Sequence, residues 1–249
     1  MLELPSPNSP APPPYNQLDP VQHGAAWVRC LSTGRLNENG LLVTDSPSGG
    51  AGLLVDPGSD AGQLLRMVDT SGAEVQAILL THGHYDHIGA VQALRHELDA
   101  PVYLHAAELP VYAGAGALAQ QFGESSFQQP DPPDALIRQG QTFRAGGVTL
   151  TARELPGHSP GHTVFVGDGF VLAGDTLFRG AIAPTNLPGA DRTLLLRGIV
   201  RELLHLPPHT VVYPGHGAPT TVGAERGRAL FRRWLAEALP HPAASTLSP

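Results

Sequence analysis

Short apolar runs bounded by glycine, asparagine and aspartate fill the first third of the chain. Runs of this length and setting are typical of strands separated by turns. The strands expected in this block lie at residues 27–31, 41–44, 53–55 and 75–80, with one helix at 60–67. Strands therefore dominate the first third of the predicted fold.

The spacing of apolar residues changes after the fourth of these strands. The next apolar positions recur every three or four residues, as on one face of a helix, and they are Ile88, Val91, Leu94 and Leu98. We expect this helix to begin at Ile88. A strand at 101–104 and an interrupted helix at 106–120 are expected after it. Residues 121–139 are rich in Gln, Pro and Asp, and we interpret them either as a lid or as a solvated surface loop.

The second half of the chain repeats the alternation of strands and helices. Strands are expected at 147–155, 163–166, 170–172 and 210–213, and helices at 194–203 and 230–235. Each half must bury one sheet face and one helix stripe, so the halves pack naturally as two sheets face to face with helices outside. We therefore predict an α+β fold, a four-layer sandwich of two mixed sheets.

The ends of the chain differ from this body. Seven of the first twenty residues are proline, a composition that favours extended, solvated backbone over a packed core. We expect residues 1–20 to form a disordered tail, 21–240 to form one domain, and 241–249 to form a C-terminal tail.

Candidate metal ligands follow the predicted strands. Four of them stand within six residues after the strand at 75–80, and these are His82, His84, Asp86 and His87. At about 100° per residue a regular helix would direct His84 away from His82 and Asp86, so we expect 82–87 to be a loop. Asp175 and His216 each follow a further apolar run, in glycine-rich context.

A Gly-His pair supplies the remaining candidate. His158 and His162 compete for this role in the segment 156–162, and spacing alone does not choose between them. Imidazole suits zinc and iron, and a carboxylate can join two cations. The ligand set therefore predicts two divalent metal ions, zinc first and iron or manganese as alternatives, and a hydrolytic site.

Composition excludes several other classes of function. The chain carries 15 arginines and no lysine against 22 acidic residues, for a net charge of −7, so neither nucleic acid nor an anionic membrane is an expected partner. The absence of lysine also excludes Schiff-base chemistry and a P-loop lysine. A single cysteine, Cys30, in an apolar run predicts a buried thiol. With no leader and no membrane span apparent, we expect a cytoplasmic protein that acts on small molecules.

The motifs resemble those of the metallo-β-lactamase superfamily, whose HxHxDH motif matches 82–87. The likeness runs from about Ala25 to Arg226. Within the superfamily, the segments 156–163, 172–178 and 214–217 are similar to those of glyoxalase II, the hydroxyacylglutathione hydrolases, and of their shorter bacterial relatives. The resemblance implies the αβ/βα sandwich. It also implies one metal on His82, His84 and His158, a second on Asp86, His87 and His216, and Asp175 bridging both. His162 is then left to pack or orient its neighbours.

The chain departs from glyoxalase II where that family holds glutathione. No lysine follows Asp175, no tyrosine follows His216, and only about thirty residues follow Pro219, too few for the family's full C-terminal region. Arg179 is the remaining candidate for binding a substrate carboxylate.

The activity that the resemblance implies is hydrolysis of a thioester by a metal-bridging hydroxide that Asp86 orients. One alternative is a persulfide dioxygenase with a single iron on His82, His158 and Asp175. Another is a lactonase or β-lactamase that uses the same hydroxide on a cyclic substrate. A nuclease of the superfamily is disfavoured because the chain is acidic.

Overall fold

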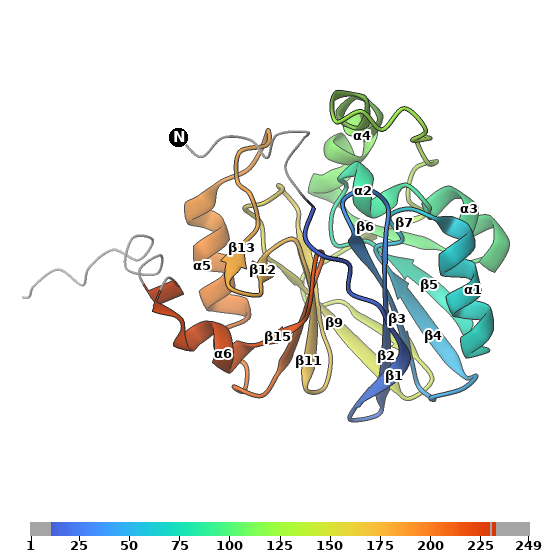
Figure 1. Cartoon of the computed structure of the whole chain (residues 1–249), viewed down its shortest axis with the longest axis horizontal. Helices are drawn as coiled ribbons and strands as arrows, with labels where there is room; N and C mark the ends of the chain where they lie inside the picture. The colour runs from blue at the N-terminus through green and yellow to red at the C-terminus, as the bar shows by residue number, and fades with distance from the viewer. Residues whose placement is uncertain (1–10, 230, 233–249) are drawn as a thin grey trace, which may run out of the picture.

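Two β-sheets pack face to face, with helices on both outer faces, in the computed structural model, which describes residues 11–229 and 231–232 (Figure 1). The first sheet has seven strands in chain order. Its strands are β1 (Gln17–His23), β2 (Ala26–Thr33), β3 (Glu38–Thr44), β4 (Ala51–Val55), β5 (Glu74–Leu79), β6 (Val102–His105) and β7 (Ala135–Ile137). The pairs from β1 to β4 are antiparallel and those from β4 to β7 are parallel, so the sheet is mixed, as predicted.

The second sheet has six strands in the order β15-β14-β11-β10-β9-β8. These strands are β8 (Thr142–Ala145), β9 (Val148–Glu154), β10 (Thr163–Val166), β11 (Phe170–Gly174), β14 (Val211–Pro214) and β15 (Thr220–Thr221). Among the described strands of this sheet, β11 and β14 pair in parallel and the other neighbours pair antiparallel. A separate hairpin joins β12 (Leu177–Phe178) to β13 (Ala181–Ile182).

The helices divide between the two outer faces and the upper rim (Figure 1). They are α1 (Ala61–Ser71), α2 (Tyr85–Ile88), α3 (Val91–Leu98), η1 (Ala106–Glu108), α4 (Leu109–Gln121), α5 (Arg192–Glu202) and α6 (Val222–Gly227). In Figure 1, α1 and α3 lie outside the first sheet and α5 and α6 lie outside the second. No helix in the part of the chain described here has the length and apolar character that a membrane crossing requires.

Alternation of side chains along the strands creates the layers, because successive residues of a strand point to opposite faces. In β3, Leu41 and Val43 pack between the sheets while Leu42 packs under the helices. In β11, Phe170 packs between the sheets and Val171 packs towards α5. Both faces of each sheet are therefore buried, as the four-layer sandwich requires.

The boundary expected at residue 20 differs from the structure. Residues 17–20 belong to β1, which pairs antiparallel with β2. Tyr15 also bonds this sheet, since its backbone N–H donates to Ser32 Oγ at 2.7 Å. The expected tail therefore overlaps the sheet. Residues 1–10 and the expected tail at 241–249 lie outside the described residues, as does most of the helix expected at 230–235.

The histidine cluster also differs from the expected loop. Residues 82–84 are non-helical, but Tyr85–Ile88 forms the single helical turn α2. The next helix, α3, begins at Val91 rather than at Ile88. The single turn directs Asp86 and His87 at the same centre, while His84 lies in the extended backbone that precedes it. His84 therefore does not point away from the other ligands, as it would in a regular helix.

Candidate metal centre

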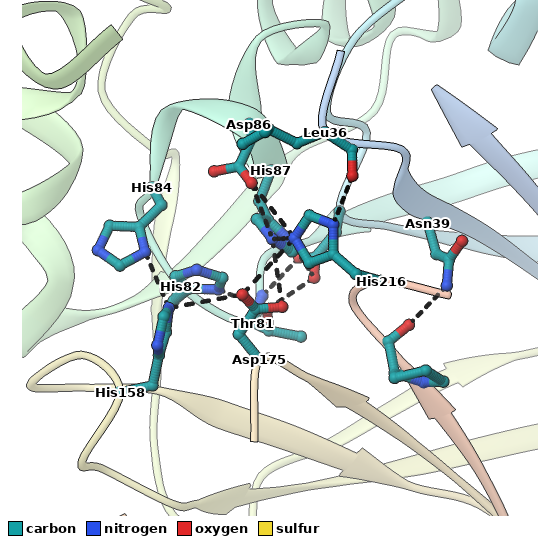
Figure 2. A network of polar contacts seen from close by, with 12 residues as sticks. Leu36, Asn39, Thr81, His82, His84, Asp86, His87, His158, Asp175 and His216 are labelled. Carbon is teal, nitrogen blue, oxygen red and sulfur yellow. Dashed lines mark hydrogen bonds and ion pairs between the residues drawn. The ribbon is translucent and has the colours of Figure 1, made fainter. Parts of the chain in front are cut away.

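Loops at the ends of four strands bring the predicted ligands together. Strand β5 leads into His82, β9 into the loop of His158, β11 into Asp175, and β14 into His216. Because β11 and β14 are parallel and adjacent, their carboxyl ends meet at one edge of the sheet. The Thr163 N–H donates to Thr81 O at 2.8 Å and ties the loop after β5 to the second sheet. The seven predicted ligands lie around one centre, which Figure 2 shows from close by.

Three histidines form the first group. Ligand atoms of His82, His84 and His158 lie within 4.8 Å of one another. His158 Nε2 lies 3.0 Å from His84 Nδ1, while the other nitrogen of His158, Nδ1, lies 2.7 Å from Pro184 O. Since a carbonyl only accepts, Nδ1 of His158 carries the proton and Nε2 presents its lone pair to the centre. His82 Nε2 is buried and has no hydrogen-bond partner among the described residues.

One carboxylate and two histidines form the second group. Ligand atoms of Asp86, His87 and His216 also lie within 4.8 Å of one another. The Nε2 atoms of His87 and His216 face each other at 3.3 Å. Their Nδ1 atoms are held from behind, by Asp56 Oδ2 at 3.2 Å and by Leu36 O at 3.0 Å. This outer support fixes the ring orientation, as it does for histidines that bind metals.

Asp175 lies between the two groups (Figure 2). Its carboxylate oxygens are 3.5 Å from His87 Nε2 and 3.6 Å from Nε2 of both His158 and His216. One of these oxygens, Oδ1, is buried and finds no hydrogen-bond partner in the part of the chain that the structure describes. A Cβ at Gly215 would lie only 2.1 Å from Oδ1, so only glycine lets β14 approach this carboxylate.

Charge is unequally divided between the groups. Burial, followed by His158, lowers the pKa of His84 to about 3. Burial also lowers the pKa of His87 and of His216, but Asp175 and Asp86 outweigh it and raise these pKa values to about 10 and about 9. The carboxylates thus favour a retained proton on the pair His87 and His216.

The donor set fits divalent cations. Two neutral imidazole nitrogens 3.0 Å apart repel unless a proton or a cation lies between them, and the orphaned atoms of His82 and Asp175 need a partner of the same kind. A divalent ion satisfies all of these atoms, and nitrogen and carboxylate ligands suit zinc, iron and manganese. The residues present could therefore hold metal ions.

The structure separates His158 from His162. His162 lies behind the centre, stacked on His82 with ring centroids 5.0 Å apart. Its Nε2 accepts the backbone N–H of Asp175 at 3.0 Å, so that nitrogen is already occupied. His162 therefore orients the loop of Asp175, while His158 faces the ligand cluster.

Two buried acidic residues that the sequence did not indicate support the site. Asp56 accepts the Thr81 N–H and hydroxyl at 2.7 and 2.6 Å, besides contacting His87. Glu108, fully buried, accepts the N–H groups of Gly83 and Gly161. Asp56 has a positive φ of 49° at the end of β4, and its place directly after an apolar run was the available signal. Glu108 gave none.

A cavity of about 640 Å³ opens onto the ligands. His84, Asp86, His158, Asp175 and His216 line its floor, and most other lining residues are apolar. Arg179, the predicted substrate contact, lies on its wall and is exposed. Phe122, in the segment interpreted as a lid or loop, also borders the cavity and packs on Tyr85 with ring centroids 6.0 Å apart. That segment contains β7 as well, and a lid movement stays a prediction.

The fold and this centre define a class: αβ/βα sandwich proteins with clustered histidines and carboxylates that could bind metal. The sequence model of the Metallo-beta-lactamase superfamily matches residues 33–216. The chain therefore belongs to that superfamily and is a metal-dependent hydrolase. The chain is 38% identical over 208 residues to the probable metallo-hydrolase YqgX of Bacillus subtilis, covering 82% of this chain and 96% of YqgX.

Two further relatives bear on the chemistry. The chain is 30% identical over 202 residues to the hydroxyacylglutathione hydrolase GloC of Haemophilus influenzae, covering 80% of this chain and 94% of GloC. The crystal structure of TTHA1623 in a di-iron-bound form matches with a TM-score of 0.71 and 41% identity, covering 80% of this chain and 96% of that one.

Proposed function

We propose that this protein hydrolyses thioesters at a two-metal centre. The observation that carries the proposal is the position of Asp175, whose carboxylate lies within 3.6 Å of histidines from both groups. A carboxylate in this position could be shared by two cations. A hydroxyacylglutathione hydrolase among the relatives and a di-iron structure among the similar folds support the same reading.

The chain's residues would divide the work as follows. His82, His84 and His158 would hold one cation, Asp86, His87 and His216 the other, and Asp175 both. Bound divalent cations lower the pKa of a coordinated water towards neutrality and so supply a nucleophile that no serine or cysteine of this site provides. Asp86 would accept a hydrogen bond from that water and orient it towards the thioester carbonyl carbon.

The cavity would position the substrate. Its apolar wall excludes bulk water from the reacting carbonyl and offers surface to an acyl or thiol chain. Arg179 stands on the same wall and would bind a carboxylate of the substrate. Neither of the glutathione contacts expected of glyoxalase II, a lysine and a tyrosine, follows Asp175 or His216 in this chain.

Metal analysis and substrate assays together test the proposal. Freshly purified protein should contain close to two zinc, iron or manganese ions per chain. It should hydrolyse S-lactoylglutathione or a simpler acyl thioester faster than an acyl-homoserine lactone or nitrocefin, and Asp175→Asn should lower this activity at least a hundredfold. One iron per chain with oxygen uptake on glutathione persulfide would instead establish a dioxygenase, and preference for the lactone or nitrocefin would establish a different hydrolase.

A further inference from the structure

A proline segment from the N-terminal end of the described chain forms part of the cavity wall. Ala11, Pro12 and Pro13 line the same cavity as the metal-ligand candidates. Pro12 lies beside the loop of His216, since a Cβ at Gly217 would be 3.7 Å from Pro12 Cβ. The segment thus borders the second group of ligands.

Hydrogen bonds on both sides hold this segment in place. Asn37 Nδ2 donates to Pro12 O at 2.9 Å. Further along, Ser32 Oγ accepts from Tyr15 N at 2.7 Å and donates to Tyr15 O at 3.0 Å, and Ser32 N donates to Asn16 Oδ1 at 2.9 Å. Pro12 and Pro13 are therefore anchored between two attachment points although both are exposed to solvent.

The three successive prolines 12–14 make this wall apolar and stiff. Each proline ring fixes φ near −65° and removes the backbone N–H, so the wall presents no amide donor and loses little entropy on contact with a ligand. The other apolar wall residues include Phe178, Leu187 and Leu118. A wall of this kind favours an aliphatic chain over the charged and amide-rich glutathione tripeptide.

We propose that Pro12 and Pro13 determine specificity, by selecting substrates with an aliphatic chain that extends past His216 along the proline segment. This inference rests on the proposed thioester hydrolysis and narrows its substrate class. Arg179 lines the same cavity as Pro12 and Pro13. One terminal carboxylate on the chain would therefore be compatible with the site.

The test compares Pro12→Gly/Pro13→Gly with Pro14→Gly in the full-length, metal-loaded protein. Pro14 is an exposed proline of the same segment that does not line the cavity, which makes it the matched control. Steady-state kinetics would use acetyl, butanoyl and hexanoyl thioesters of N-acetylcysteamine, and acetyl thioesters of alkanethiols of increasing length. In either the acyl series or the thiol series, the double variant should raise KM about five- to tenfold for the longer chains. The kcat values and the KM of the shortest substrate should not change. The reason is that each methylene group that loses its apolar contact lowers the binding free energy.

A binding measurement keeps this test separate from the proposed function. Calorimetry with acetate, butanoate, hexanoate and 1-butanethiol should show that wild type and Pro14→Gly gain affinity with chain length, while the double variant loses that gain. If wild type hydrolyses no thioester but its gain of affinity with chain length depends on Pro12 and Pro13, the proposed function fails and the role of the prolines stands. If the double variant matches wild type in both substrate series and in binding, the proline segment does not determine specificity.

Discussion

The side chain of Glu108 accepts the backbone N–H of Gly83 at 2.9 Å, inside the loop that carries His82 and His84. Its other carboxylate oxygen accepts the N–H of Gly161 at 2.6 Å, in the loop that carries His158. One fully buried carboxylate therefore joins the two loops that supply the first group of ligands. A Cβ at Gly83 would lie 2.7 Å from Tyr112 N, so the loop also has no room to shift towards α4.

Replacing this carboxylate should weaken metal binding without unfolding the protein. In Glu108→Gln one oxygen is exchanged for an NH2 group that faces an N–H donor, so one loop loses its anchor. We expect about ten- to hundredfold weaker affinity for the first cation, as for other groups that orient metal ligands. Competition with a chromophoric chelator measures this. Glu154→Gln, at a half-exposed glutamate near His105, is the control, and equal metal affinity in both variants would contradict the role.

Asp175→Asn should lower the number of metal ions that the protein retains. Asparagine keeps the size of the side chain but removes the charge that lies within 3.6 Å of His158 and His216. Without a shared anionic ligand we expect about one ion per chain after dialysis and at least a hundredfold lower hydrolytic rate, a loss of the order seen when electrostatic stabilisation is removed. Elemental analysis of the variant beside Asp168→Asn, an exposed aspartate outside the centre, gives the comparison. Full metal content in Asp175→Asn would show that it does not bridge.

The two histidines of the segment 156–162 should respond differently to substitution. His158→Ala removes a ring nitrogen that faces His84 at 3.0 Å and should cost most of the affinity for the first cation. His162→Gln places an amide oxygen near the position of Nε2, where it can still accept the N–H of Asp175. We therefore expect near-normal metal content in His162→Gln with a modest loss of activity, measured by elemental analysis and thioester turnover. The reverse order of metal loss would reassign the ligand.

Much of the fold follows from local pattern. The strand at 163–166 was predicted at the bounds observed, and the helix face of Val91 and Leu94 is buried as its spacing required. Strand β1 was missed because it is an edge strand with polar residues and Pro20, features that edge strands tolerate and that resemble a tail in sequence. Its pairing with β2 is a tertiary fact that local pattern does not encode.

The ligands were predictable for a different reason from the residues that support them. His82, His84, Asp86 and His87 form a dense cluster after an apolar strand, and few structural needs produce such a cluster. Glu108 acts through backbone N–H groups 25 and 53 residues away in the chain. Any buried glutamate has the same local appearance, so only the three-dimensional structure reveals this role.

Metal uptake should depend steeply on pH. The pKa of His87 is raised to about 10 and that of His216 to about 9, because Asp175 and Asp86 outweigh the effect of burial. Each Nδ1 faces an acceptor and the two Nε2 atoms lie 3.3 Å apart, so without metal the pair retains one proton between its Nε2 atoms at neutral pH. A cation must displace this proton to bind. Between pH 6 and pH 8, affinity for the second cation should rise about tenfold per pH unit for each proton displaced. An indicator dye in a weakly buffered solution measures the number of protons released per metal ion bound. Release of no proton would contradict the predicted pH dependence.

Arg179→Ala should raise KM for substrates that carry a carboxylate while leaving neutral substrates unaffected. Arg179 is exposed on the cavity wall, and within the described residues it forms no hydrogen bond or ion pair that would hold its guanidinium elsewhere. An exposed guanidinium–carboxylate contact contributes about 0.5 to 1 kcal/mol, so KM should increase about two- to fivefold with little change in kcat. Arg179→Lys should recover only part of this, since an ammonium group cannot bind a carboxylate through two parallel hydrogen bonds. Paired kinetics with succinyl and butanoyl thioesters of the same thiol isolate the charge, and Arg144→Ala, at an exposed arginine on β8, controls for the loss of one positive charge. An equal change of KM for both thioesters would mean that Arg179 contributes surface to the wall rather than a carboxylate contact.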